Sequence, residues 1–207
     1  MDGINQVNVN TKAGLTFASG LRSILRQDPD IVMLGEIRDY ETAEIAIRAA
    51  ITGHLVLSTI HTNDAPSSIV RLKDMGVAPY LVSSALVGII AQRLIRKLCL
   101  HCREKYSASN YEKEILGVPK DQELTLYRKV GCNRCSNTGY KGRVGIYEIM
   151  EINRELRELI NEDASVENIT NAALRNGMKT LSKSAINVIL KGNSTVEELL
   201  RVTLLGE

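Results

Sequence analysis

Hydrophobic positions in the first sixty residues switch between helix-like and strand-like spacing. Apolar residues recur at intervals of three and four from 15 to 27, which predicts an amphipathic helix. Asp28-Pro29-Asp30 ends it, and the unbroken apolar run 31–34 predicts a short strand buried on both faces. An alanine-rich helix over 41–51 and a second strand over 54–60 follow. This order predicts a parallel sheet in an α/β fold.

Helix-capping residues predict boundaries later in the chain. Asn63 or Asp64 caps a helix that ends before Gly76, and Pro79 opens a long helix reaching about Leu98. Residues 106–128 show little periodicity, and the glycines between 130 and 150 predict turns and short strands. From Asn153 the pattern is helical, with a capping box at Thr195-Val196-Glu197-Glu198.

The four cysteines form two C-x-x-C pairs, Cys99 with Cys102 and Cys132 with Cys135. This spacing lets thiolates converge on one ion, and four of them complete the tetrahedral shell that structural Zn²⁺ prefers. Disulfides are the alternative, but the absence of a signal peptide favours reduced thiols. A site of three cysteines and His101 is a further alternative. Four thiolates would leave the metal no catalytic position.

Composition and charge restrict the function only weakly. The chain has 26 Lys and Arg against 24 Asp and Glu, a formal net charge of +2, so bulk charge does not indicate nucleic acid or an anionic membrane as partner. The longest apolar stretch, 80–91, is shorter than the about 20 residues that cross a bilayer. We expect a soluble chain that meets a membrane through protein partners or a surface helix.

Candidate chemistry lies at the carboxyl ends of the two predicted strands. Glu36 follows the first strand and His61 the second, and a right-handed crossover places both at one sheet edge. An acidic residue in this position can bind Mg²⁺ beside nucleotide phosphates, and Thr59 and Thr62 can bond phosphate oxygens. For Glu36 alone, an ordinary solvated strand end is the favoured interpretation. His54 begins the second strand at the opposite edge, where we expect a structural role.

Several segments together resemble the secretion ATPases of type II secretion and type IV pilus assembly. The resemblance runs nearly end to end, and its motifs are Leu15–Arg22, Leu25–Asp30, Leu34–Asp39, Thr52–His54 with His61–Asn63, Ala91–Leu94, Gly142–Glu148 and the tetracysteine insertion. It implies the C-terminal part of a RecA-like P-loop NTPase core over 1–98, lacking the P-loop. A tetracysteine zinc-binding subdomain over 99–150 and a C-terminal helical subdomain over 151–207 would follow.

The resemblance also implies roles for residues at the sheet edge. Gly35-Glu36 matches the Walker B element, so Glu36 would act on Mg²⁺ or its water, and His61 matches a sensor of the terminal phosphate. The implied catalytic residues are Glu36 and His61, and the implied nucleotide-binding set is Gly35, Glu36, Arg38, Asp39, Thr59 and His61. For Arg38 and Asp39, a salt-bridged loop is the alternative to a catalytic or intersubunit role.

One essential part of such an ATPase is absent from the sequence. No Gly-Lys dipeptide occurs, so there is no Gly-x-x-x-x-Gly-Lys-Ser/Thr loop to hold phosphates. The resemblance places that loop before residues 3–7, so we expect the carboxyl part of a longer protein, inactive alone. The whole protein would use ATP and Mg²⁺, form a homo-hexamer, and lie in the cytoplasm, peripheral to the inner membrane, where platform proteins are its partners in protein export or pilus polymerisation.

Two other functions remain open from the sequence. A non-catalytic, zinc-containing regulator or scaffold would need no phosphate loop. A zinc-ribbon nucleic-acid binder would use the basic residues near the first cysteine pair, but one Phe, no Trp and the balanced charge count against direct nucleic-acid binding.

Ser184-Ala185 stands where the family pattern has Asp-Gly.

Overall fold

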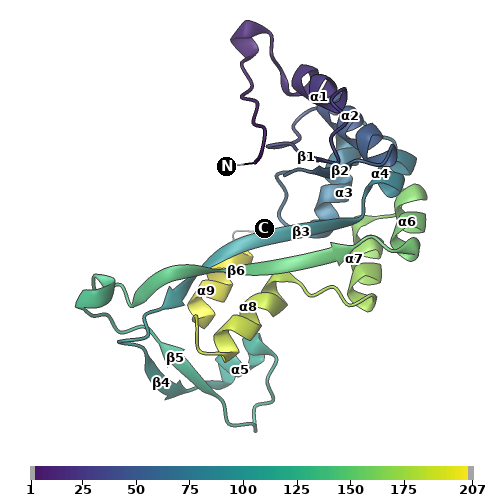
Figure 1. The fold of residues 1–207 in the computed structure, drawn as a ribbon. Coiled ribbons are helices and arrows are strands. Elements are labelled where there is room, and N and C mark those ends of the chain that lie inside the picture. Colours follow the sequence, from purple (N-terminus) through teal and green to yellow (C-terminus); the bar gives the residue numbers. More distant parts are fainter. Residues whose placement is uncertain (1–2, 205–207) are drawn as a thin grey trace. The chain divides into compact units, whose positions relative to one another are not determined.

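The computed structural model describes residues 3–204, which divide into two compact units (Figure 1). Unit 1 comprises residues 1–89 and 150–177, and unit 2 comprises residues 90–149 and 178–207. These units follow different boundaries from the three-part division at residues 98 and 150, which stays a prediction. Within the described residues, no helix is long and apolar enough to cross a bilayer.

Unit 1 is built around a parallel pair of strands, as the sequence predicts. Strands β1 (Ile31–Met33) and β2 (Leu55–Leu57) pair with Val32 opposite Val56, and α2 (Tyr40–Ile51) connects them. The α/β strand-helix-strand order is therefore confirmed. The remaining elements of this unit are η1 (Thr11–Ala13), α1 (Phe17–Leu25), α3 (Ala65–Asp74), α4 (Pro79–Ala85), α6 (Arg154–Asn161) and α7 (Val166–Arg175).

The prediction that the first strand is buried on both faces is wrong for the described residues. One face of the β1–β2 sheet packs on a small core that includes Val32, Leu21 of α1 and Ala46 of α2. On the other face, Ile31 and Met33 expose 62% and 74% of their surface. An unbroken apolar run is typical of a parallel strand that is covered on both faces. Within the described residues, helices cover only one face of this sheet, so the prediction fails for the other face.

Pro79 opens a helix as the sequence predicts, but the predicted extension of that helix to Leu98 is wrong. Helix α4 ends at Ala85, and Gly88–Leu98 forms strand β3, which pairs with β6 (Tyr140–Glu151). Ile152 N–H donates to Val87 O at one end and Cys99 N–H donates to Gly139 O at the other, so the two strands are antiparallel. Burial alternates from Gly88 onward, which is strand periodicity. Strand β6 likewise replaces the predicted short strands.

Unit 2 packs helices against this ribbon and a second, short hairpin (Figure 1). Strands β4 (Glu104–Ser107) and β5 (Thr125–Arg128) are antiparallel, and α5 (Asn110–Leu116) lies between them in the sequence. These three elements are too short to show a detectable hydrophobic periodicity. The other elements are η2 (Asn133–Cys135), α8 (Leu181–Leu190) and α9 (Val196–Leu204). The core of unit 2 contains Ile95, Leu126, Ile146, Ile189 and Leu199, all nearly inaccessible to solvent.

Polar groups from α8, α9 and the segment between them cover parts of both edges of the ribbon. Along β3, Arg96 N–H donates to the Glu198 carboxylate at 2.8 Å and Leu98 N–H donates to Asn193 O at 2.9 Å. Along β6, Tyr147 N–H donates to Ser184 Oγ at 3.1 Å. Covering an edge in this way blocks pairing with foreign strands. Ser184 therefore has a structural role, and the adjacent Ala185 is fully buried in the core.

Substituting Gly192 with alanine is expected to destabilise unit 2 by about 1–3 kcal/mol. Gly192 has φ +72°, and an added Cβ would lie 2.6 Å from Cε2 of Tyr127. The ring cannot move aside freely because the Arg103 guanidinium stacks on it, 4.4 Å from its centroid. Gly142, with φ +77° and no atom within 4 Å of its added Cβ, is the matched control. Urea unfolding measures both variants, and equal losses would contradict the steric argument.

Candidate functional site

Backbone hydrogen bonds extend the β1–β2 pairing beyond the strands and position the segment that carries Glu36. Leu34 N–H donates to Leu57 O at 2.8 Å, and Ile37 N–H donates to Thr59 O at 2.9 Å. Gly35 and Glu36 lie between these two bonds. Because β1 and β2 are parallel, Glu36 and His61 leave them at the same edge of the sheet.

Glu36 and His61 lie at the same sheet edge, as their sequence positions predict, and the structure brings them into direct contact. His61 Nε2 lies 3.1 Å from Glu36 Oε2, and the Arg38 guanidinium forms an ion pair with Oε1 of the same carboxylate. The His61 side chain is 88% exposed and that of Glu36 only 18%. The hydrogen bond from Arg38 lowers the pKa of Glu36 more than its partial burial raises it, and His61 adds to the lowering. Glu36 is therefore an ionised carboxylate at neutral pH.

The other residues predicted at this edge have separate partners. Thr59 Oγ1 donates to Gly35 O at 2.6 Å, and the Asp39 carboxylate caps α2 by accepting from Thr42 N–H at 2.8 Å. Thr62 Oγ1 lies 2.8 Å from Ser68 Oγ at the start of α3 rather than beside Glu36. At the opposite edge, His54 Nδ1 lies 3.0 Å from Ala49 O, a structural contact of the kind the sequence predicts.

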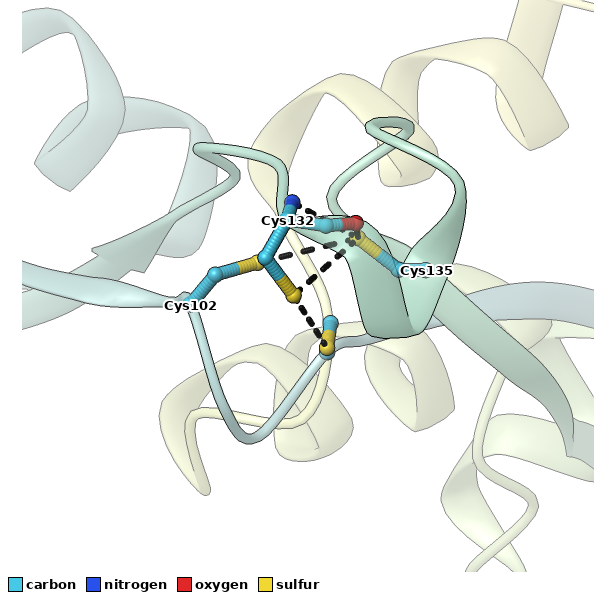
Figure 2. Close-up of side chains that lie close together, drawn as sticks. Cys102, Cys132 and Cys135 are labelled. Carbon is cyan, nitrogen blue, oxygen red and sulfur yellow. Dashed lines mark hydrogen bonds between the residues drawn. The ribbon is translucent and has the colours of Figure 1, made fainter.

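The four cysteines converge in unit 2, where Figure 2 shows three of them labelled with their sulfur atoms directed toward one another. The Sγ atoms lie within 4.8 Å of one another, and the closest pairs are 3.8–3.9 Å apart. A disulfide would need about 2.05 Å, so these are free thiols. Tetrahedral Zn²⁺ with Zn–S bonds of about 2.3 Å requires sulfurs about 3.8 Å apart. The donor set and its spacing fit Zn²⁺.

Backbone amides of the second cysteine pair donate to the sulfur atoms. Cys132 N–H and Gly139 N–H donate to Cys135 Sγ at 3.2 and 3.3 Å, and Gly131 N–H donates to Cys102 Sγ at 3.4 Å. Burial raises the pKa of the Cys135 thiol, but the hydrogen bonds from Cys132 N–H and Gly139 N–H, together with those from the Cys132 and Cys102 side chains, outweigh it and lower that pKa to about 6. The cysteine spacing does not predict these amide donors, and the glycines at 131 and 139 are their only signal in the sequence.

His101 lies apart from this cysteine cluster. Both of its ring nitrogens are within 3.0 Å of Nη1 of Arg134, so the imidazole packs on that guanidinium. Among the described residues, the group suited to holding a metal consists of the four cysteines alone. The geometry therefore favours four thiolate ligands over the alternative of three cysteines and His101.

The known proteins that this chain resembles in sequence are secretion system and pilus assembly proteins. The family described as "Type II/IV secretion system protein" matches residues 1–201. Type II secretion system protein E of Pseudomonas aeruginosa is 50% identical over 98% of this chain and 40% of its own length. The type IV pilus assembly ATPase PilB of Myxococcus xanthus is 50% identical over 95% of this chain and 35% of its own length.

Solved structures of similar proteins show the same fold. The pilus retraction motor PilT with bound ADP aligns with a TM-score of 0.63 and 30% identity, covering 90% of this chain and 43% of that one. The ATPase DotB of Legionella pneumophila aligns with a TM-score of 0.66 and 20% identity, covering all of this chain and 48% of that one. The chain thus spans about 40% of the length of its first curated relatives. By sequence and by fold, it belongs to the type II/IV secretion system protein family.

Proposed function

We propose that this chain is the C-terminal part of an ATPase that couples ATP hydrolysis to protein export or pilus assembly. The observation that carries the proposal is the contact between Glu36 and His61 at the carboxyl edge of two parallel strands. Relatives that share about half of the sequence are named as secretion proteins or pilus assembly ATPases, which supports it. Without a phosphate loop, this chain alone would not hydrolyse ATP.

In this proposal, Gly35, Glu36, Arg38, Asp39 and His61 form one side of a nucleotide site, and Thr59 holds the Gly35 carbonyl behind it. The ionised Glu36 carboxylate would hold Mg²⁺ or accept a proton from the attacking water, for which its ion pair with Arg38 would have to open. His61 is exposed enough to turn toward a terminal phosphate. Asp39 fixes the start of α2 immediately after Arg38. Bound Mg²⁺ would neutralise charge on the phosphates.

The whole protein would be a homo-hexamer, cytoplasmic and peripheral to the inner membrane, with secretion or pilus platform proteins as partners. The Zn²⁺ at Cys99, Cys102, Cys132 and Cys135 would be structural. Four thiolates fill a tetrahedral shell and leave no position for substrate, so the proposed chemistry lies at Glu36 rather than at the metal.

The expected result for Glu36→Gln in the longer protein is a loss of ATP turnover of about 100-fold or more, with ATP binding retained. Glutamine keeps the size of the side chain but removes the charge and the base. Phosphate release measures turnover, and Glu41→Gln is the control because Glu41 is exposed and pairs with Arg22. Full turnover in Glu36→Gln would show that catalysis does not depend on Glu36 and would contradict the proposal, whereas no turnover in the unsubstituted longer protein would favour a non-catalytic regulator or scaffold. Turnover by residues 1–207 alone would refute the predicted inactivity.

The two units differ in charge, and the excess of basic residues in unit 2 favours nucleic-acid binding more than the whole-chain composition does. Unit 2 contains 16 Lys and Arg against 9 Asp and Glu, whereas unit 1 contains 10 against 15. Several of these cations have partners within unit 2, however: Arg96 pairs with Glu198, Arg103 donates to Gly192 O and Arg128 pairs with Glu104. We propose no direct nucleic-acid binding. A single-stranded oligonucleotide that binds with steep salt dependence would contradict this.

A further inference from the structure

A single residue binds both peptide groups that flank Glu36. The Thr59 hydroxyl donates to Gly35 O at 2.6 Å, and the Thr59 carbonyl accepts from Ile37 N–H at 2.9 Å. Glu36 is the one residue between these two groups. The β1 strand ends at Met33, so the Glu36 segment lies beyond regular pairing with β2. Thr59 therefore supplies two of the bonds that fix this segment.

The two bonds differ in what they require of the sequence. Any residue at position 59 could supply the carbonyl, but the bond to Gly35 O requires a side chain that donates a hydrogen bond, which here is the Thr59 hydroxyl. Gly35 has no side chain to restrict its own rotation, so its carbonyl needs an external bond to hold one direction. The orientation of the Gly35–Glu36 peptide plane determines the direction in which the Glu36 side chain leaves the backbone. Through this peptide, the Thr59 hydroxyl controls the approach of Glu36 to His61.

The same hydroxyl cannot also donate to a phosphate. Threonine has a single hydroxyl hydrogen, and phosphate oxygens without a proton accept hydrogen bonds only. The Gly35 carbonyl already takes that hydrogen at 2.6 Å. A Thr59 that donated to phosphate would release the Gly35 peptide at the moment when Glu36 has to be in place. The bond to Gly35 and a phosphate-binding role are thus mutually exclusive.

We propose that Thr59 is a positioning residue for Glu36 and not the nucleotide ligand that the sequence predicts. This inference rests on the proposed function, because it matters only if Glu36 takes part in hydrolysis. It differs from the resemblance to secretion ATPases in assigning the Thr59 hydroxyl to the protein backbone. Its effect is on the rate of the chemical step and not on nucleotide affinity.

The test compares Thr59→Val with Thr59→Ser in the longer protein. Valine keeps the branched shape and the backbone carbonyl and removes only the hydroxyl, whereas serine keeps the hydroxyl. We expect Thr59→Val to lower kcat by about 100-fold, the size of effect that a misplaced catalytic group produces, with KM for ATP and Kd for ADP unchanged. Thr59→Ser is expected to retain most of the turnover of the unsubstituted protein. Thr59→Ala provides the same readout if the valine variant does not fold.

A double-mutant cycle with Glu36→Gln separates this inference from the proposed function. If Thr59 acts through Glu36, Thr59→Val will cause no further loss of turnover in the Glu36→Gln background. An equal loss in both backgrounds would overturn the positioning role while the proposed function stands. A rise in KM or Kd with kcat retained would identify a nucleotide ligand and would also overturn it. Full turnover in Glu36→Gln alone would refute the proposed function and the positioning role together.

Discussion

Treatment with a strong chelator is expected to unfold the cysteine-bearing segments of unit 2 while unit 1 stays folded. The sulfur atoms of residues 99, 102, 132 and 135 come from two loops that are distant in the sequence. Without a metal, only weak hydrogen bonds from backbone amides to sulfur hold these loops together at the cluster. A structural Zn²⁺ contributes folding free energy directly, on the order of 10 kcal/mol in small zinc peptides. Hydrogen exchange followed by mass spectrometry should show faster exchange in 99–107 and 125–140, with residues 17–85 unchanged.

Two substitutions make this prediction specific. Cys132→Ser removes one thiolate and is expected to abolish stoichiometric zinc binding, measured as zinc content per chain after dialysis. His101→Ala is the control, because His101 packs on Arg134 and lies outside the cysteine cluster, so its removal should leave zinc content unchanged. Unchanged hydrogen exchange after proven removal of the metal would show that the metal does not stabilise unit 2. Loss of zinc in His101→Ala would contradict the site of four cysteines.

Sequence reasoning located the candidate sites where local spacing or strand direction determines position. The cysteine cluster follows from two C-x-x-C pairs, and the contact between Glu36 and His61 follows from the common polarity of parallel strands. The sequence did not distinguish helix from strand at Gly88–Leu98, because the apolar spacing there fits either element. The strand state of β3 depends on pairing with β6, about fifty residues away. No local pattern carries that information.

Side-chain partners could not be predicted from the sequence for the same reason. Thr59 was expected to bind phosphate, but its hydroxyl bonds to Gly35 O, 24 residues earlier. The capping box at Thr195–Glu198 is half right: Glu198 N–H donates to Thr195 Oγ1 at 3.4 Å, but the Glu198 carboxylate binds Arg96 of β3. Local rules identify the helix start, whereas tertiary packing determines what the carboxylate contacts.

Glu198→Ala is therefore expected to destabilise unit 2 by about 3–5 kcal/mol, the usual effect of breaking a buried ion pair. The Glu198 side chain is fully buried. It accepts from Arg96 N–H at 2.8 Å, from the Arg96 guanidinium at 2.7 Å and from Arg201 at 3.0 Å. Without the carboxylate, the Arg96 N–H at the β3 edge and two guanidinium groups lose their acceptor, and α9 loses its ion pair with β3.

The pH dependence of stability distinguishes this ion pair from simple packing. Burial raises the pKa of Glu198, but hydrogen bonds from Arg96 and Arg201 outweigh it and lower that pKa to about 2, from an ordinary value of 4.5. A lowered folded-state pKa stabilises the fold above the unfolded-state value and loses that contribution as the pH falls toward 2. In urea unfolding, the stability difference between the unsubstituted chain and Glu198→Gln should therefore shrink between pH 4.5 and pH 2.

Glu197→Gln is the matched control, because Glu197 is the preceding residue and its ion pair with Lys129 is largely exposed. Exposed ion pairs contribute about 0–1 kcal/mol, so this variant should lose little stability at any pH. If Glu197→Gln and Glu198→Gln lost the same stability, burial would not be the reason for the strength of the Glu198 pair. A stability difference for Glu198→Gln that did not change with pH would place the effect in side-chain shape instead of charge.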